Sequence, residues 1–460
     1  MTAHSMEVQI NKKKFPLTAK RITVYKQSKV IEAVDQSGRY YYLLFYKDQF
    51  LNGTSTDHMK LGTHIHRAWK HGIHFDGTHP LAGELLRQRD SYSFTSFHLF
   101  FKRLKETYSH TQTALIATFF DTFASSGEIN RILKEIYYHY QRNGQVFKAY
   151  QILLLGTECE PSVQFFTDMI NKLEFKPYKE MYQHLDKAAE KAPIQLESIC
   201  FSNLLDPSKA TKLLSFYQQQ GRWMDELTLR IHLLGNRFTS DNFSAIQGLA
   251  KNFTEQEQLD ILLDLYNSCR HPQVAEHLAE SLFALGDADS IVEYVMASDL
   301  PLQERHLPNV LEAFEQADDL LLASLMNRPI DRLLEISKHE PHLLEQLAAP
   351  FVRAALKEYS PDDILDWLAP LSQAGHHLPI EQKLHRMKSL AEDPDRQYDL
   401  GELYFHFRQL DQAIDCFTWE MELHPENPKP VNYLVKICTE KGEKEEAAAY
   451  KQLLIHMQKR

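Results

Sequence analysis

The stretch PDRQYDLGELYFHFRQLDQAIDCFTWEMELHPEN, residues 394–427, decides the fold that this sequence predicts. Small and apolar residues recur through it at helical spacing and define the packed faces of two helices and the end of the second: Leu400, Gly401, Tyr404, Ala413, Phe417 and Pro425. Gly401 and Ala413 are small, so the two backbones can approach closely while larger side chains fill the space around them. Pro425 cannot continue a helix because it lacks a backbone N–H. We therefore expect a pair of short, closely packed helices.

The same positions resemble the tetratricopeptide repeat (TPR), a two-helix unit that stacks into an α-α superhelix. Two positions depart from the TPR pattern: Gln397 stands where an aromatic residue is usual, and Glu420 where a small residue is usual. The resemblance implies a mainly α fold, a TPR-like helical solenoid, in which the first helix of each unit lines a concave groove for a partner.

A second unit of the same kind follows directly and ends the chain. It begins at Pro428 and has Leu434, a turn at Gly442 and Ala447 in the corresponding places. The last stretch, 450–460, is rich in Lys and Gln, which suits a solvent-facing capping helix.

Three segments upstream fit the repeat spacing more loosely, namely Asn130–Pro161, Pro207–Ser240 and Pro272–Pro301. The stretches between them, near 164–206, 241–271 and 306–393, are interpreted as degenerate helix pairs that lack the small-residue signature. Helical periodicity alone does not separate such repeats from ordinary helices, so the alternative is an irregular helical bundle with one TPR pair at its end.

The N-terminal part has a different pattern. The runs Arg21–Val34 and Arg39–Tyr46 are rich in Val, Ile and Tyr, and Asp35–Gly38 between them is a hairpin signal. The expected organisation is a small basic β or α+β module at 1–90, a degenerate helical-repeat array at 91–393, and a TPR pair with a capping helix at 394–460.

The charge is distributed unevenly along the chain. The net charge is −11, yet residues 1–110 hold 17 Lys and Arg against 9 Asp and Glu, which gives +8 there and −19 in the remainder. This split indicates either two partners of opposite charge or a basic module that docks on the chain's own acidic body.

The hydrophobic content of 43% is that of a folded globular protein. The five cysteines are scattered without a C-x-x-C pair, so we expect reduced thiols and no bound cofactor. No apolar run has the length of a leader or a membrane span, which predicts a cytoplasmic protein without membrane contact.

The TPR resemblance also predicts groove positions, which the first helix of each unit should supply. In the two C-terminal units they are Asp395, Tyr398, Glu402, Phe405 and His406, then Lys429, Asn432, Lys436, Thr439 and Glu440. TPR proteins that clamp a terminal carboxylate use Lys and Asn where this chain has Tyr398 and Glu402, so that subclass is disfavoured. An aromatic, partly acidic groove suits a peptide or helix with basic and apolar groups. The alternative is that Tyr398 and Phe405 only pack against neighbouring helices.

A histidine cluster between His58 and His79 offers a different function, that of a metal-dependent enzyme. The ligand candidates are His64, His66, His71 and His74, with Asp57 and Asp76 among them. Imidazoles and carboxylates bind zinc well, and the H-x-H pair His64 and His66 could point at one ion. The spacing matches no familiar closed site, so a histidine-rich loop without an ion is the favoured interpretation.

Binding of nucleic acid by the basic module is the second alternative. Its cations would meet phosphates while tyrosines stack on bases, and the residues are Lys12, Lys13, Lys14, Lys20, Arg21, Lys26 and Lys29 with Tyr25 and Tyr40, Tyr41 and Tyr42. Solubilising lysines on an exposed strand edge give the same pattern.

Nucleotide-binding, nucleophile-elbow and zincin motifs are not found in the sequence, so no catalytic residues are assigned. The expected function is therefore a protein-interaction scaffold or regulatory adaptor that binds a peptide or protein partner, and not an enzyme.

Overall fold

The computed structural model describes residues 4–56, 59–125, 127–181, 191–297, 302–328, 330–337, 340–391 and 393–458. The chain divides into two compact units, unit 1 at Met1–Val274 and unit 2 at Ala275–Arg460. The sequence predicts boundaries after residues 90 and 393. Those boundaries stay predictions; in the structure, the N-terminal sheet shares one hydrophobic core with the helices that follow it.

The strands of unit 1 form one curled sheet in the order β5-β4-β3-β2-β1-β7, and β6 also pairs with β2. Neighbouring strands are antiparallel except for the parallel pair β1 and β7. The strands are β1 (Ser5–Ile10), β2 (Lys13–Tyr25), β3 (Ser28–Val34), β4 (Tyr40–Tyr46), β5 (Gln49–Ser55), β6 (Ile73–Asp76) and β7 (Ser91–Phe94). Asn52 on β5 exchanges two 2.9 Å hydrogen bonds with the backbone of Thr95, so the two outer strands approach each other.

The predicted hairpin around Asp35–Gly38 is confirmed, because β3 and β4 pair across it and Gly38 has a φ of +84°. One turn was not foreseen: Arg21–Val34 is divided by a turn at Lys26 and Gln27. Neither residue is a glycine or proline, so the sequence carries no breaker there, and Lys26 takes a φ of +53°.

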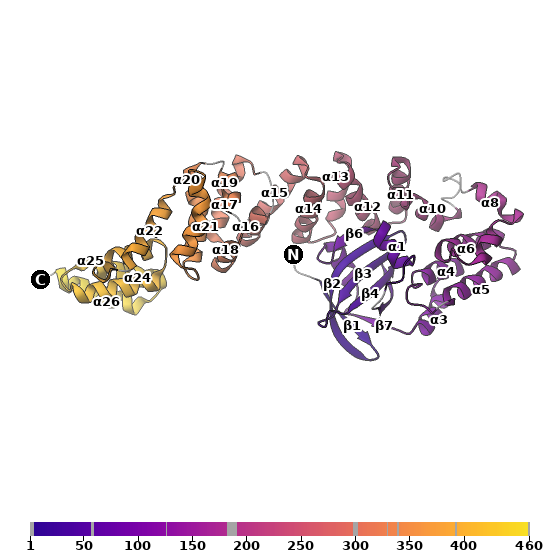
Figure 1. Ribbon diagram of the computed structural model, residues 1–460, viewed down its shortest axis with the longest axis horizontal. Helices are drawn as coiled ribbons and strands as arrows, with labels where there is room; N and C mark the ends of the chain where they lie inside the picture. Colours follow the sequence, from indigo (N-terminus) through magenta and orange to yellow (C-terminus); the bar gives the residue numbers. More distant parts are fainter. Residues whose placement is uncertain are drawn as a thin grey trace. The chain divides into compact units, whose positions relative to one another are not determined.

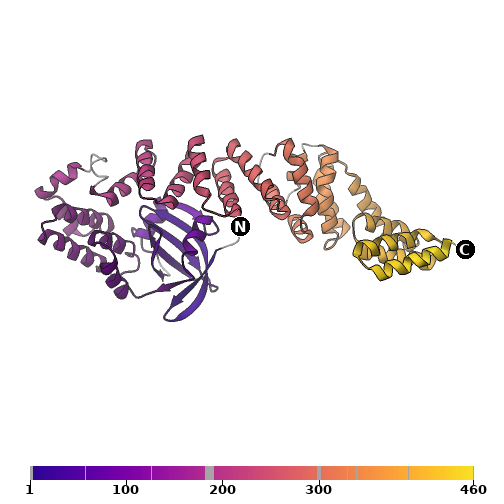
Figure 2. The same cartoon turned by 180° about the vertical axis from the view of Figure 1, so that it is seen from behind.

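Helices follow this sheet along the chain. Those of unit 1 are α1 (His64–His71), α2 (Pro80–Leu86), α3 (Phe97–Thr107), α4 (His110–Thr118), α5 (Glu128–Arg142), α6 (Val146–Cys159), α7 (Gln164–Ile170), α8 (Lys176–Met181), α10 (Pro193–Phe201), α11 (Pro207–Gln219), α12 (Trp223–Asn236), α13 (Ser240–Ala250) and α14 (Glu255–Cys269), with a 3-10 turn at Leu173–Phe175. Both views show α3–α6 on one side of the sheet and α11–α14 in a row along its upper edge (Figures 1 and 2). The module is thus α+β and fused to helices.

One core joins the sheet to the first helices. It combines side chains from β3 and β4 with others from α1 and α3–α6, among them Val30, Tyr42, Leu44, Tyr46, Ile65, Phe100, Leu115 and Ile136. A strand with one face covered by helices alternates between buried and exposed side chains. Residues 41–46 of β4 are instead all buried, because the curled sheet is covered on both faces.

A buried ion network fastens the sheet to the later helices. The Lys29 ammonium on β3 donates to Asp225 of α12 at 2.7 Å, and both side chains are 1% exposed. Arg222 donates to Asp225 at 2.8 Å and to both carboxylate oxygens of Glu197, each at 2.8 Å. Burial lowers the pKa of Lys29, but Asp225 and Asp48 more than reverse that effect, so the pKa is raised overall. The amine therefore stays charged.

Other cations of the N-terminal module pair with helix carboxylates in the same way. Lys26 donates to Glu158 at 2.5 Å, and Arg67 lies 3.5 Å from Asp121. Arg87 pairs with Glu257 on α14. The basic module is therefore docked on acidic residues of its own chain, which is one of the two explanations that the charge split allows.

Unit 2 is helical throughout its described residues. Its helices are α16 (Ala288–Ala297), α17 (Leu307–Gln316), α18 (Asp319–Leu325), α19 (Asp331–Ser337), α20 (Pro341–Ala355), α21 (Pro361–Gln373), α22 (Pro379–Ala391), α23 (Gln397–His406), α24 (Leu410–Leu423), α25 (Pro428–Lys441) and α26 (Lys444–Gln458), with 3-10 turns at Glu304–His306 and Pro394–Arg396, while α15 (Pro272–Leu285) spans the boundary between the units. The mainly helical class with an N-terminal sheet is confirmed. Within the described residues, no helix is both long and apolar enough to span a membrane.

The predicted close contact between α23 and α24 is confirmed. A Cβ built on Gly401 would lie 2.9 Å from the Phe417 ring and 3.1 Å from the Cys416 Cβ. Phe417 and Ala413 are fully buried. The glycine is thus needed because a core aromatic ring occupies the space where a side chain would begin.

Gly401→Ala is expected to lower the free energy of unfolding of unit 2 by about 1–3 kcal/mol, because the added methyl overpacks a filled contact. Gly248→Ala on α13 is the matched control, since its Cβ would meet no atom within 4 Å. That substitution should be neutral or stabilising by up to about 1 kcal/mol through helix propensity. Calorimetry on the full chain would measure both, and equal shifts in the two variants would contradict the packing argument.

Candidate partner-binding site

The predicted groove residues lie on α23 and α25, apart from Asp395 on the 3-10 turn Pro394–Arg396, and the limits of both helices follow from local sequence. Asn427 caps α25 by accepting a 3.1 Å hydrogen bond from the Lys429 N–H, and Pro428 takes the first helical position. Gly442 ends α25 with a φ of +78°, which glycine adopts at low cost. α23 follows the short turn Pro394–Arg396.

An aromatic cluster joins the two helices. The ring of Tyr433 on α25 lies 5.3 Å from Phe405 and 6.1 Å from Tyr398, both on α23, measured between ring centroids. Tyr433 also stacks on the buried Phe417 at 4.7 Å with an interplanar angle of 9°. Tyr398, Phe405 and Tyr433 are all partly exposed, so the cluster is anchored in the core and still reaches the surface.

Glu402 lies among these rings. The Tyr433 hydroxyl donates to its carboxylate at 3.1 Å. Burial raises the pKa of Tyr398, and a hydrogen bond to Glu402 raises it further. The Tyr433 phenol therefore holds this carboxylate in place, beside aromatic faces. We call Tyr398, Glu402, Phe405, Tyr433 and Lys436 the α23–α25 face.

Lys436 completes this face. Its ammonium lies 5.0 Å from the centroid of the Tyr433 ring, a cation–π distance. Lys436 contacts the Tyr433 ring, so the Glu402 carboxylate and the exposed parts of the other rings stay open to a cation of a partner.

The remaining predicted positions have other surroundings. Asn432 donates to the Pro428 carbonyl of its own helix, and Thr439 donates to that of Val435. Asp395 and Lys429 are exposed. His406 pairs with Lys383 at 2.9 Å, and burial, followed by Lys383 and Arg353, lowers its pKa.

Glu440 lines a different feature, a cavity of about 250 Å³ within unit 2. Its other charged lining residues are Glu315, Asp319, Arg353, Lys357 and Arg408. Four of these are already paired, as Arg353 with Glu315 and Lys357 with Asp319. Glu440 therefore belongs with this charged cavity rather than with the aromatic face.

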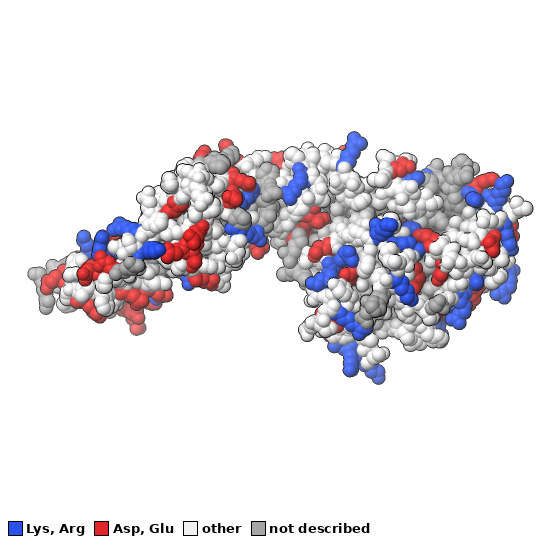
Figure 3. Space-filling model, viewed as in Figure 1, with Lys and Arg blue, Asp and Glu red and all other residues white. Residues whose placement is uncertain are grey.

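Unit 2 is strongly acidic. Residues 275–460 hold 18 Lys and Arg against 34 Asp and Glu, a net charge of −16, whereas residues 1–274 have +5. Figure 3 shows clusters of acidic side chains on the drawn face of this unit. The α23–α25 face thus lies in a negative field, which attracts cations.

Tyr433 is the residue of the α23–α25 face that the sequence pattern did not select. It follows Asn432, a predicted groove position, by one residue. Repeat spacing assigns faces by position in the helix, and a shift of one residue turns a side chain by about 100°. An aromatic residue next to a predicted groove position was the available signal.

The structure does not bring the four candidate histidine ligands together. His64 and His71 lie at opposite ends of α1, with His66 between them, and His74 lies on β6, where its Nδ1 is 3.0 Å from the Thr23 hydroxyl. Asp57 and His58 lie outside the described residues. Among the described side chains, the one group of three placed to share an ion is Cys438, Glu443 and Glu446.

His64 has a structural environment instead. Its ring is 5% exposed and lies 4.5 Å from the Phe119 ring, and its Nε2 is 2.8 Å from the Ser28 hydroxyl. That hydroxyl also lies 2.9 Å from the Tyr25 carbonyl, to which it donates. Burial, with Arg67 and Lys26 nearby, lowers the pKa of His64 well below its usual value. The contact between His64 and Ser28 connects α1 to the β2–β3 turn.

The surface expected for nucleic acid is largely occupied. Lys26 and Lys29 are buried in ion pairs, and Arg21 pairs with Glu32 at 2.8 Å. Three of the four tyrosines are buried too, namely Tyr25, Tyr41 and Tyr42, and are closed to stacking. Lys12, Lys13, Lys14 and Tyr40 stay exposed near strand ends, as lysines that guard a sheet edge do, and Lys20 is exposed within β2.

The five cysteines are free thiols, and Cys200, Cys416 and Cys438 are buried.

Compared with known proteins, the chain matches no family model, and no curated protein matches its sequence. The function of this protein is therefore inferred from its own geometry.

Proposed function

We propose that this protein is an interaction scaffold, and that unit 2 is a TPR-like array of helix pairs whose α23–α25 face holds a basic and apolar segment of a partner protein. The observation that carries the proposal is the partly exposed aromatic cluster of Tyr398, Phe405 and Tyr433 around a fixed Glu402. Rigid aromatic side chains give large contact areas at a low cost in conformational entropy.

The charge of unit 2 supports a basic partner. A net charge of −16 over residues 275–460 accelerates encounter with cationic segments and disfavours acidic ones. Glu402 is held by the Tyr433 hydroxyl before any partner arrives, so binding a Lys or Arg there costs little reorganisation. The ligand we propose is a segment with a Lys or Arg next to a Leu, Ile or Phe.

A peptide-display selection on the full chain tests the proposal. We expect the wild type to enrich peptides that place Lys or Arg beside large apolar residues. Phe405→Ala should weaken binding of the enriched peptides by about tenfold or more, as loss of a central anchor does. Glu402→Gln should remove the preference for Lys and Arg but keep the apolar preference.

Trp419→Ala is the matched control, because Trp419 lies on α24 and is 51% exposed. It removes a large exposed aromatic side chain away from the α23–α25 face and should leave peptide binding unchanged. The thermal stability of each variant shows that the fold persists. Selection of the same peptides with the same affinities by Phe405→Ala and Glu402→Gln would exclude this face as the binding site.

A further inference from the structure

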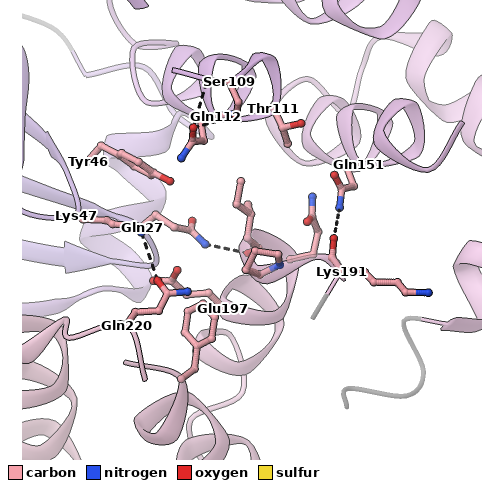
Figure 4. A pocket seen from close by; sticks show the side chains of 14 residues that line it. Gln27, Tyr46, Lys47, Ser109, Thr111, Gln112, Gln151, Lys191, Glu197 and Gln220 are labelled. Atoms are coloured by element: carbon pink, nitrogen blue, oxygen red, sulfur yellow. Dashed lines mark hydrogen bonds between the residues drawn. The ribbon is translucent and has the colours of Figure 1, made fainter. Parts of the chain in front are cut away.

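A polar cavity of about 300 Å³ lies in unit 1, between the sheet and the helices (Figure 4). The turns β2–β3 and β4–β5 supply Gln27 and Lys47, β4 supplies Tyr46, and most of the remaining wall comes from α4, α6, α10 and α11. Five glutamines line it: Gln27, Gln112, Gln151, Gln195 and Gln220. None of these residues belongs to the α23–α25 face.

Some of these amides are buried without partners. Gln195 is 7% exposed, and neither its Nε2 nor its Oε1 has a hydrogen-bond partner among the described residues. Gln27 is 2% exposed and donates to the Ile194 carbonyl at 2.9 Å, but its Oε1 has no described partner. Buried polar atoms without partners are costly, and their concentration at one cavity indicates a molecule that pairs with them.

The helix end beside Gln195 attracts negative charge. α10 begins at Pro193, and its N-cap residue is Ala192, which offers no side-chain hydrogen bond. Ile194 and Gln195 occupy the next positions and line the cavity. The first N–H groups of a helix have no acceptor within it and carry a partial positive charge, so an anion is stabilised there.

Lysine amines reinforce this preference. Lys47 lines the cavity, and its amine lies 3.3 Å from the Gln220 Oε1, a long contact for a cation. Burial, followed by the nearby Arg222, lowers the pKa of Lys47, and an anion in the cavity would reverse this effect. Lys191 at the rim is exposed. Glu197 adds no free negative charge, because Arg222 and the Tyr217 hydroxyl engage its carboxylate.

Aromatic side chains border the polar groups. Tyr46 and Phe216 both line the cavity and are buried. Burial raises the pKa of Tyr46, although a hydrogen bond with Gln112 works against it, so the phenol is held neutral. A planar group would therefore meet apolar faces beside amide donors and acceptors.

We propose that this cavity binds a small organic anion. Its carboxylate or phosphate would lie between the N-terminus of α10 and Lys47, and an adjoining amide-like edge, with a donor beside an acceptor, would pair with Gln195. A nucleoside monophosphate and a short peptide share this chemistry. A glutamine amide reads either edge with two hydrogen bonds.

Calorimetric titration of the full chain with adenosine monophosphate, alanyl-glutamine and inorganic phosphate tests this. We expect one of the two organic probes to bind more tightly than phosphate, and which one binds identifies the source. Gln195→Leu, which keeps the shape, should weaken that probe by about tenfold or more. It should also raise the melting temperature of the free protein, because it removes the buried, unpaired amide of Gln195.

Lys47→Met should weaken the same probe and reduce the salt dependence of its binding. The matched control is Gln219→Leu on α11, since Gln219 is exposed and does not line the cavity; its titration should match the wild type. Three results would overturn the proposal. The first is that no probe binds at millimolar concentration, which would mean that the cavity holds only water. The second is that phosphate and both organic probes bind equally well. The third is that Gln195→Leu has a lower melting temperature than the wild type.

Discussion

Asp225→Ala is expected to lower the free energy of unfolding of unit 1 by about 3–5 kcal/mol, because it leaves two buried cations without their shared counter-ion. Lys29 and Arg222 both donate to Asp225, at 2.7 and 2.8 Å. The Lys29 side chain is 1% exposed and that of Arg222 is 5% exposed, so water cannot replace the carboxylate. Urea denaturation, with hydrogen exchange to locate the loss at β3 and α12, measures the effect.

Two comparisons separate this network from ordinary surface pairing. Glu7→Ala breaks the ion pair with Lys14, whose partners are 44% and 55% exposed, and should cost less than about 1 kcal/mol. The double variant Lys29→Met with Asp225→Leu removes both charges and leaves Arg222 with Glu197, so it should recover most of the loss. A loss of less than about 1 kcal/mol in Asp225→Ala would mean that water reaches the site.

Acid should destabilise unit 1 through His79, and His79→Asn should remove that part of the pH dependence. His79 is 3% exposed, its ring lies 4.4 Å from that of Phe75, and its Nδ1 accepts from the Leu81 N–H at 3.2 Å. Burial, and then His4, lowers its pKa from 6.5 to about 3. Asparagine keeps the helix cap of α2 without titrating.

The direction follows from the two pKa values. Below 6.5 the unfolded chain takes up a proton at His79, whereas the folded chain does not do so until about 3. Stability is therefore lost as the pH falls, by about 3 kcal/mol between about pH 6.5 and about pH 4. Urea denaturation across this range measures the free energy of unfolding at each pH. Between about pH 6.5 and about pH 4, His79→Asn should lose about 3 kcal/mol less than the wild type.

His71→Asn is the matched control, because His71 is exposed on α1. It should follow the wild type within about 0.5 kcal/mol throughout. If His79→Asn had the same pH slope as the wild type, the His79 imidazole would take up its proton in the folded protein as it does in the unfolded chain, which would contradict this prediction.

The α23–α25 face shows how far sequence reasoning reached into the candidate site. Repeat spacing selected Tyr398, Glu402, Phe405 and Lys436, because residues three or four apart share a helix face. It did not select Tyr433, whose ring joins the others, and it included Glu440, which lines another cavity. Contacts between helices depend on their relative rotation, which no single helix encodes.

The histidines and the glutamines both show that distance along the sequence does not predict distance in the folded protein. Histidines close in sequence separate onto α1, β6 and the start of α2, because a helix and a strand point successive side chains in different directions. The five glutamines are scattered from residue 27 to residue 220 and meet at one cavity. Proximity in the sequence therefore predicted a histidine site that the structure does not form, and it gave no sign of the glutamine-lined cavity.

The sequence by itself determined the local elements of this protein: a helical body after an N-terminal sheet, the hairpin at Asp35–Gly38, and the close helix pair at Gly401. Periodicity, turn residues and side-chain size act over a few neighbouring residues, so they can be recognised along the chain. Tertiary structure alone decided that Lys29 would meet Asp225, 196 residues away, and that the basic module would fuse with the helices after it. Such contacts depend on which surfaces bury one another, and that is settled only when the whole unit packs.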